Sequence, residues 1–332
     1  MRSRGSARHA LAGALAVAAV AVPLACGDDG GGGGASEDAA TPAVRQEVAF
    51  PRVSGRSFRD LLGHFRQGPV VAPSVSILEP GENRFGFALF DRGNRQIGDL
   101  DVGLYIAPGL DEMARGPYHA SYNRIEVEPE FRSRNSSADP DSARSVYVAP
   151  VDFPRAGTYL VAAVTVLGGQ FVAASPAQVR VGRHGDIPGV GDRAVRVHTP
   201  TVQAAGGNIE TIETRVPPDS MHEVDLADAL DQGRPVVLLF SSPALCESRV
   251  CGPVTDVAEQ VKSEFEDDAD FIHVEFYEDN ELSKGPREAA RAWGLTSEPI
   301  LFTIDRDGTV AARIEGAFSA DELRAAVRRA LR

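Results

Sequence analysis

The sequence predicts two structured parts of different class, an all-β part followed by a part in which helices and strands alternate. Three observations support this prediction. The chain has 332 residues, which is more than one hydrophobic core usually organises. Between residues 48 and 182, short apolar runs alternate with turn residues. From residue 190 onward, runs of strand length alternate with apolar residues at helical spacing.

The first 26 residues have the three parts of a secretory signal, namely a basic start, an apolar run and small residues near a cleavage point. The apolar run, residues 10–22, is shorter than the roughly 20 residues that a membrane helix needs. Leu24-Ala-Cys26 resembles the lipobox of bacterial lipoproteins, with Pro23 where that pattern prefers an aliphatic residue. This resemblance implies a diacylglyceryl group on Cys26 and an anchor on the outer face of the cell membrane. Ordinary secretion is the alternative.

Residues 27–47 begin with a Gly-rich run that contains no core-forming side chains, and we expect a flexible tether there. Over the whole chain, hydrophobic residues make up 43% and charged residues 24%, which suffices for globular cores. The formal net charge is −13, and nucleic-acid binding requires clustered Lys and Arg instead. The composition therefore argues against a nucleic-acid partner.

Residues 48–182 contain six apolar or alternating runs separated by turn residues. These predicted strands cover residues 74–78, 84–90, 102–106, 145–148, 158–166 and 177–181. Many short strands with few helical patterns are typical of an antiparallel β-sandwich. Residues 153–161, in which a Pro-Arg-Ala-Gly turn leads into Thr-Tyr, resemble the closing strands of bacterial immunoglobulin-like modules. That resemblance implies an immunoglobulin-like sandwich.

A linker of turn formers at residues 183–189 precedes the second domain, residues 190–332. A short helix is expected over 225–233, then a strand over 236–240 and a helix beyond Cys251. The next predicted elements are a strand over 271–277 and a helix over 286–293. A hairpin follows with strands 300–304 and 310–314. Ser319 and Glu322 form a capping-box pattern that opens the last helix.

This order of elements resembles the thioredoxin fold, and several motifs match that family. Residues 293–302 resemble the segment that carries the family's cis-proline, here Pro299. Residues 307–319 resemble its terminal hairpin and the glycine before the last helix. Cys251-Gly-Pro-Val254 resembles the Cys-Gly-Pro-Cys active site. The resemblance covers about residues 188–332 and implies a thioredoxin fold.

Four departures from the thioredoxin pattern concern the chemistry. Val254 occupies the resolving-cysteine position, so a second thiol must come from Cys246. The family's tryptophan before the first cysteine is missing. Leu239 stands where thioredoxins commonly have a buried acid, and Glu298 replaces the usual Thr or Ile before the cis-proline. The Cys-x4-Cys spacing also resembles that of Q-type peroxiredoxins, but Pro243 stands where those proteins need a Thr.

The spacing of Cys246 and Cys251 constrains how they can pair. Residues five apart in a regular helix have Cα atoms roughly 8 to 9 Å apart, whereas a disulfide needs them within about 7 Å. At least one cysteine must therefore lie in a loop ahead of the helix. Since Pro is tolerated in the first helical turn, Cys251 is expected at the helix start, where the helix dipole stabilises a thiolate. Which cysteine attacks a substrate stays open.

The sequence therefore predicts an exported, membrane-anchored and extracytoplasmic thioredoxin-like protein. It is expected to exchange thiols and disulfides with exported proteins through Cys246 and Cys251, with Pro299 and Glu298 contacting the substrate. One alternative is a binding or scaffold lipoprotein in which Cys246–Cys251 is only a structural disulfide. The other is a thiol peroxidase. No cofactor is expected, and the histidines have no ligand spacing that predicts a metal site.

Overall fold

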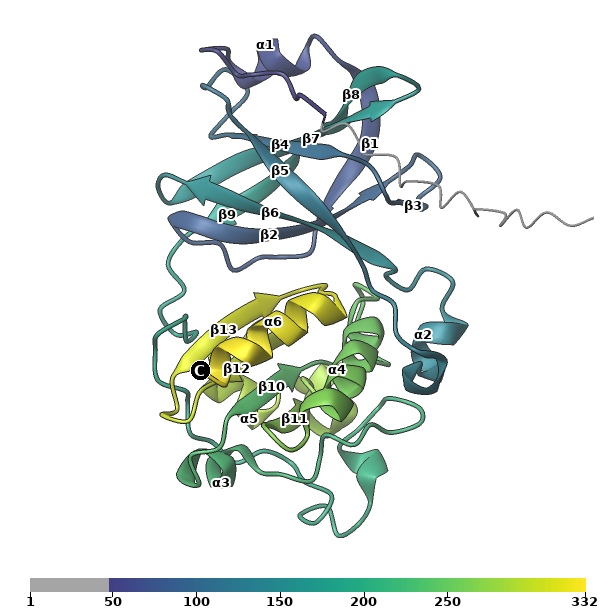
Figure 1. The fold of residues 1–332 in the computed structure, drawn as a ribbon, viewed down its shortest axis with the longest axis vertical. Coiled ribbons are helices and arrows are strands. Elements are labelled where there is room, and N and C mark those ends of the chain that lie inside the picture. The colour runs from purple at the N-terminus through teal and green to yellow at the C-terminus, as the bar shows by residue number, and fades with distance from the viewer. Residues whose placement is uncertain (1–47) are drawn as a thin grey trace, which may run out of the picture. The chain divides into compact units, whose positions relative to one another are not determined.

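The computed structural model describes residues 48–332, which form two separate β-sheets (Figure 1). The predicted signal, the tether and Cys26 lie outside these residues. The first sheet is nine-stranded and built from residues 66–181, and the second is four-stranded and built from residues 236–315. Among residues 48–332, no helix combines the length and the apolar character that crossing a membrane requires.

The first part of the chain contains nine strands and two short helices. They are α1 (Phe58–Leu62), β1 (Arg66–Pro73), β2 (Gly81–Phe90), β3 (Gln96–Ile97), β4 (Val102–Ala107), β5 (Arg115–Arg124), α2 (Arg134–Ala138), β6 (Ser145–Phe153), β7 (Gly157–Leu167), β8 (Gln170–Ser175) and β9 (Ala177–Val181). The predicted all-β character is confirmed. The residues that were expected to form strands 84–90, 102–106, 145–148, 158–166 and 177–181 all lie within observed strands.

Seven of these strands close on themselves. The pairing runs β1-β8-β7-β4-β5-β6-β2, and β1 also pairs with β2, which completes a barrel-like ring. An immunoglobulin-like sandwich of two stacked sheets is not confirmed. Closure removes the free sheet edges that two open sheets would expose. Aromatic side chains, among them Phe85, Phe87 and Tyr147, fill the interior.

Residues 74–78 were predicted as a strand, and this prediction is wrong. The segment between β1 and β2 is irregular, with one isolated bridge at Leu78. The backbone N–H groups of Ser76 and Ile77 donate to the carboxylate of Glu315, both at 2.8 Å. These donors are therefore not available for a ladder of strand hydrogen bonds. Strands β1, β5 and β8 were not predicted from the sequence, since prolines and exposed polar residues interrupt the first two.

The second part of the chain has the predicted order of elements. It contains α3 (Leu226–Asp231), β10 (Val236–Phe240), α4 (Cys251–Phe265), β11 (Asp270–Val274), α5 (Glu288–Ala292), β12 (Ile300–Ile304), β13 (Val310–Glu315) and α6 (Ala320–Ala330). The sheet order is β11-β10-β12-β13, with β10 parallel to β11 and antiparallel to β12. The capping box of Ser319 and Glu322 opens α6 as predicted.

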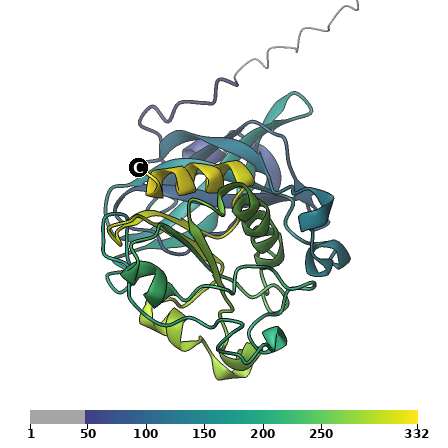
Figure 2. The same cartoon turned by 60° about the horizontal axis from the view of Figure 1, so that its bottom comes forward.

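Strand β10 is buried on both faces, which explains its uninterrupted apolar sequence. Val237 and Leu239 pack with α4 and α6 in one apolar cluster. Val236, Leu238 and Phe240 pack with α3 and α5 in a second cluster on the opposite face. Figure 2 shows α4 (green) and α6 (yellow) side by side. The central sheet therefore has helices on both faces, and it carries the cysteine loop at the end of β10.

Polar contacts join the barrel-like sheet to the second part of the chain. The guanidinium of Arg84 in β2 binds the carboxylate of Glu322 in α6 through two hydrogen bonds of 2.9 and 3.1 Å and also donates to the carbonyl of Ala317. Arg215 and Asp256 form a buried ion pair at 2.9 Å, and Arg215 donates further to the carbonyl of Phe131. Because both arginines satisfy several acceptors, these contacts fix orientation as well as proximity.

Candidate active site

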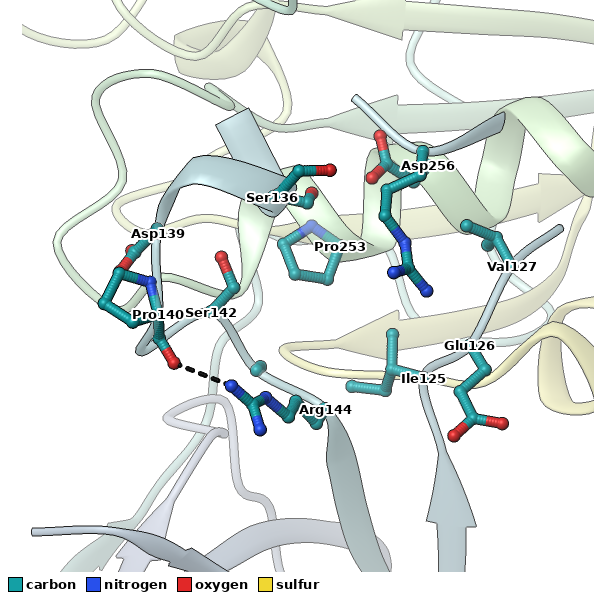
Figure 3. A pocket seen from close by; sticks show the side chains of 13 residues that line it. Ile125, Glu126, Val127, Ser136, Asp139, Pro140, Ser142, Arg144, Pro253 and Asp256 are labelled. Atoms are coloured by element: carbon teal, nitrogen blue, oxygen red, sulfur yellow. Dashed lines mark hydrogen bonds between the residues drawn. The ribbon is translucent and has the colours of Figure 1, made fainter. Parts of the chain in front are cut away.

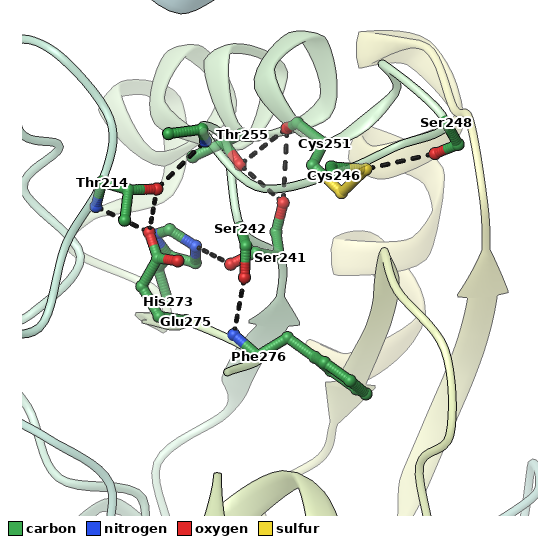
Figure 4. The surroundings of a disulfide bond; sticks show 11 residues. Thr214, Ser241, Ser242, Cys246, Ser248, Cys251, Thr255, His273, Glu275 and Phe276 are labelled. Carbon is green, nitrogen blue, oxygen red and sulfur yellow. Dashed lines mark hydrogen bonds between the residues drawn. A yellow bond between two sulfur atoms is a disulfide. The ribbon is translucent and has the colours of Figure 1, made fainter. Parts of the chain in front are cut away.

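The two cysteines form a disulfide at the start of α4 (Figure 4). Cys251 is the first residue of this helix, whereas Cys246 lies in the loop that follows β10. Their Cα atoms are 5.9 Å apart, so the predicted displacement of one cysteine from the helix is confirmed. The loop turns sharply here, since Arg249 has a φ of 58° and its N–H donates to the carbonyl of Cys246.

The two sulfurs differ in exposure. Cys251 is completely buried, whereas Cys246 is half-buried and its Sγ lies 3.1 Å from the hydroxyl of Ser248. Hydroxyl groups hold the buried cysteine in place, because Thr255 donates to the carbonyl of Cys251 at 2.9 Å and Ser241 donates to it at 3.3 Å. Only Cys246 is therefore open to a partner from solvent.

Glu298 lies next to the disulfide. The Glu298–Pro299 peptide bond is cis, as the sequence predicted for Pro299. A carboxylate oxygen of Glu298 and both cysteine sulfurs lie within 4.8 Å of one another. Both carboxylate oxygens are buried, and neither has a hydrogen-bond partner within residues 48–332. Burial raises the pKa of Glu298 to about 8; the neighbouring Ser242 opposes this rise, and the charge of Glu275 adds to it. At neutral pH this carboxyl group is mostly protonated.

The cysteine loop also contacts the barrel-like part of the chain. The guanidinium of Arg249 pairs with Asp141 and, at 3.5 Å, with Asp139, both from the segment between β5 and β6. A cavity of about 180 Å³ opens beside Glu298 and Pro299 and is also lined by Ser248 and Ser76. A partner could reach the edge of the disulfide loop through this cavity.

A second cavity, of about 370 Å³, lies between α4 and residues 125–144 (Figure 3). Pro253 and Asp256 of α4 line it, together with Ser136 and Arg144, whose guanidinium donates to the carbonyl of Pro140. Neither cysteine reaches this cavity. This second cavity is therefore separate from the disulfide site.

A buried cluster of acids and histidines lies beneath the cysteine loop. Glu213, Asp219, His222 and His273 have side chains that are 0–1% exposed. Burial opposes a charge on His273, but the carboxylates of Asp219 and Glu213 outweigh it and raise its pKa well above the usual range. The other ring nitrogen of His273 lies 2.9 Å from the carbonyl oxygen of Ser241 (Figure 4). The hydroxyl group of Ser241 in turn donates to the carbonyl oxygen of Cys251.

The sequence located the cysteines, the cis-proline and Glu298, and the structure brings these residues together. The sequence did not reveal the buried cluster of Glu213, Asp219, His222 and His273. The spacing of His222 and His273 along the sequence predicts no common site, yet the fold brings their ring centroids within 5.1 Å of each other. One available signal was His273 within an otherwise apolar strand. Leu239, at the position of the family's buried acid, packs in an apolar cluster, so the acidic groups near the disulfide come from other positions.

The fold and the site define a thioredoxin-like domain that carries a disulfide at a helix start. In agreement, residues 222–331 match the family model of the thioredoxin-like domain. Among solved structures, dsbF from MTB in mixed oxidized and reduced forms has 20% sequence identity and a TM-score of 0.29, covering 42% of this chain and 96% of that chain. A thiol:disulfide interchange protein of the thioredoxin family from Chlorobium tepidum TLS has 18% identity and a TM-score of 0.30, covering 43% and 97%. No curated protein matches the sequence.

Proposed function

We propose that this protein exchanges thiols and disulfides with exported protein partners through Cys246 and Cys251. The observation that carries the proposal is the placement of the disulfide at the start of α4, beside a cis-proline and an unpaired buried carboxyl group. A disulfide that served only as a staple would not need an acid with a raised pKa next to its sulfurs. Perturbed acids beside reactive groups are typical of catalytic sites.

The difference in exposure supports Cys246 as the cysteine that reacts with the substrate and Cys251 as its buried partner. A substrate thiolate attacks Sγ of Cys246, the Cys246–Cys251 bond breaks, and Cys251 leaves as a thiolate. A second substrate thiolate then attacks the substrate sulfur of the mixed disulfide and releases Cys246. The substrate dithiol is oxidised to a disulfide, and the cysteine pair is reduced by two electrons. In the reverse direction, the thiolate of Cys246 attacks the substrate disulfide and Cys251 resolves the intermediate.

Glu298 is the proton carrier in this scheme. Its carboxyl group lies within 4.8 Å of the sulfurs and is protonated at neutral pH, so it protonates the leaving thiolate of Cys251 directly or through one water. In the reverse direction the carboxylate accepts the proton again. Pro299 and the backbone beside Glu298 provide the surface against which a substrate segment would lie, with the adjoining cavity as its entrance.

Two single variants test the assignment. With Cys251→Ser, Cys246 should form a stable mixed disulfide with a small aromatic disulfide such as dithiobisnitrobenzoate. With Cys246→Ser, the buried Cys251 should react at least about tenfold more slowly. The protein contains a single tryptophan, Trp293, which is fully buried, so its fluorescence reports whether each variant is folded.

The same experiment separates the alternatives. A folded Cys251→Ser variant that traps no mixed disulfide, together with a potential below about −300 mV for the wild-type pair, would identify a structural disulfide. Rapid peroxide reduction that depends on Cys246 would favour the peroxidase.

We also propose that the protein is exported and held at the outer face of the membrane by a lipid on Cys26. The proposal rests on the lipobox-like residues 24–26 and the Gly-rich segment behind them. In a lipoprotein-producing bacterial host, the full chain should fractionate with membranes, and Cys26→Ala should release it. Release of the unchanged chain into the soluble exported fraction would support ordinary secretion instead.

A further inference from the structure

We propose that Glu213, Asp219, His222 and His273 bind one divalent transition-metal ion, for which zinc is the best match. Each residue offers one donor atom, and these four atoms lie within 4.8 Å of one another. Their side chains are 0–1% exposed. The site is distinct from the disulfide, and the proposal does not depend on thiol exchange.

The donor set and its spacing fit a four-coordinate ion. Zinc binds imidazole and carboxylate at about 2.0–2.2 Å, which places the donors of a tetrahedron about 3.3–3.5 Å apart. His222 Nε2 lies 3.4 Å from a carboxylate oxygen of Asp219, and His273 Nδ1 lies 3.5 Å from one of Glu213. Two further separations are shorter, 2.7 Å from His222 Nε2 to the same Glu213 oxygen and 2.8 Å from His273 Nδ1 to the other carboxylate oxygen of Asp219. These two pairs would separate by about 0.6 Å on binding.

Without a metal ion, the buried carboxylates of Glu213 and Asp219 carry more negative charge than one proton compensates. His273 Nε2 faces the carbonyl oxygen of Ser241 and must carry a hydrogen there. Its Nδ1 faces carboxylate oxygens, so either the ring or a facing carboxyl group must carry a proton there. One imidazolium against the carboxylates of Glu213 and Asp219 leaves a net charge of −1 in a site without solvent contact, which is costly.

A divalent cation removes this excess. Two carboxylates, two neutral imidazoles and one M²⁺ sum to zero charge. The buried guanidinium of Arg215 cannot serve instead, because it is already paired with Asp256 at 2.9 Å. A divalent ion therefore neutralises the charge of this donor set.

The outer contacts resemble those around metal ligands. Metal-bound histidine usually donates its other N–H to a carbonyl or carboxylate, and His273 has this contact with Ser241 at 2.9 Å. The carboxylates are oriented by backbone donors, from Arg215 to Glu213 at 2.7 Å and from Met221 to Asp219 at 2.9 Å. Of the ring nitrogens of His222 and His273, only Nδ1 of His222 has no hydrogen-bond partner within residues 48–332.

The test begins with the wild-type full chain in its oxidised form, in which Cys246 and Cys251 are joined and cannot bind metal. Elemental analysis after gel filtration should find about one zinc per chain. Removal by a chelator should lower the unfolding midpoint by about 5 °C or more, and zinc should restore it. Cobalt in place of zinc should show the visible bands of a four-coordinate ion without thiolate charge-transfer absorption.

A matched pair of variants locates the ion. His222→Gln should lower the zinc content below about 0.1 per chain, whereas His198→Gln, at a 74% exposed side chain outside the cluster, should leave it unchanged. If His222→Gln does not fold, the wild-type measurements decide alone. Metal content near zero, with no shift of the unfolding midpoint on adding zinc, would overturn the proposal. Retention of zinc by folded His222→Gln would overturn it as well.

Discussion

Replacing Glu298 with Gln should make the stability of this protein less dependent on pH. Glutamine preserves the shape of the side chain but cannot ionise. In the wild type, burial raises the pKa of Glu298 from its usual 4.5 to about 8. The contribution of the protonated Glu298 to the stability of the folded state is therefore complete below pH 4.5. It is lost progressively as the pH rises from 4.5 to 8.

The magnitude follows from the size of the shift. A change of 3.5 pKa units (8 minus 4.5) corresponds to about 5 kcal/mol at 1.36 kcal/mol per unit. Between pH 5.5 and 7.5, Glu298 should therefore lower the free energy of unfolding by about 2–3 kcal/mol. Glu298→Gln should lack this loss. Groups that do not interact with Glu298 contribute equally to both proteins and cancel in the difference.

The assay is urea unfolding of both proteins at several pH values from 5 to 9, followed by the fluorescence of the single tryptophan. Glu130→Gln, which changes an exposed carboxyl group, is the control and should keep the wild-type dependence on pH. Equal pH slopes for Glu298→Gln and the wild type would refute the reasoning about burial. If Glu298 also carries the proton during exchange, the variant should reduce the rate of disulfide exchange by about 10²-fold or more.

Three further predictions concern stability and can be checked by denaturant unfolding. Gly316→Ala should destabilise the fold by more than about 2 kcal/mol, because the added Cβ would lie 1.8 Å from the carbonyl oxygen of Ser74 at a φ of +73°. Gly185→Ala meets no atom within 4 Å and should change stability by less than about 0.5 kcal/mol; equal effects would contradict the contact. Arg215→Met should cost about 3–5 kcal/mol because it leaves the buried charge of Asp256 unpaired, and a neutral result would show that this pair contributes little. Reduction of the disulfide should cost about 2 kcal/mol for so short a loop, and a much larger loss would indicate a mainly structural bond.

The second part of the chain was largely predictable because its signals are local. The apolar run of β10, the capping box of α6 and the hairpin at residues 305–308 each specify one element through neighbouring residues. The spacing of Cys246 and Cys251 was equally informative, since the reach of a disulfide excludes a regular helix across both. The matching thioredoxin-like family model covers the same region.

The first part was harder to predict. Prolines and exposed polar residues interrupt several of its strands. The hydrogen bonds that close the ring join β1 to both β2 and β8. A strand pattern does not say which edges pair. Residues 74–78 carried an apolar alternation, yet their N–H groups bind Glu315 far along the chain. This distant acceptor takes the N–H groups that a strand ladder would use.

The sequence by itself determined the thioredoxin-like order of elements, the displaced cysteine pair and the acid before the cis-proline. These features depend on residues that are neighbours along the chain or on the fixed geometry of helices and disulfides. Only the tertiary structure decided that Cys251 is buried while Cys246 is reachable, and that Glu298 lies unpaired beside both sulfurs. It also decided that two histidines and two acids meet beneath the cysteine loop. Burial and proximity of this kind arise from packing between distant segments, which no local pattern encodes.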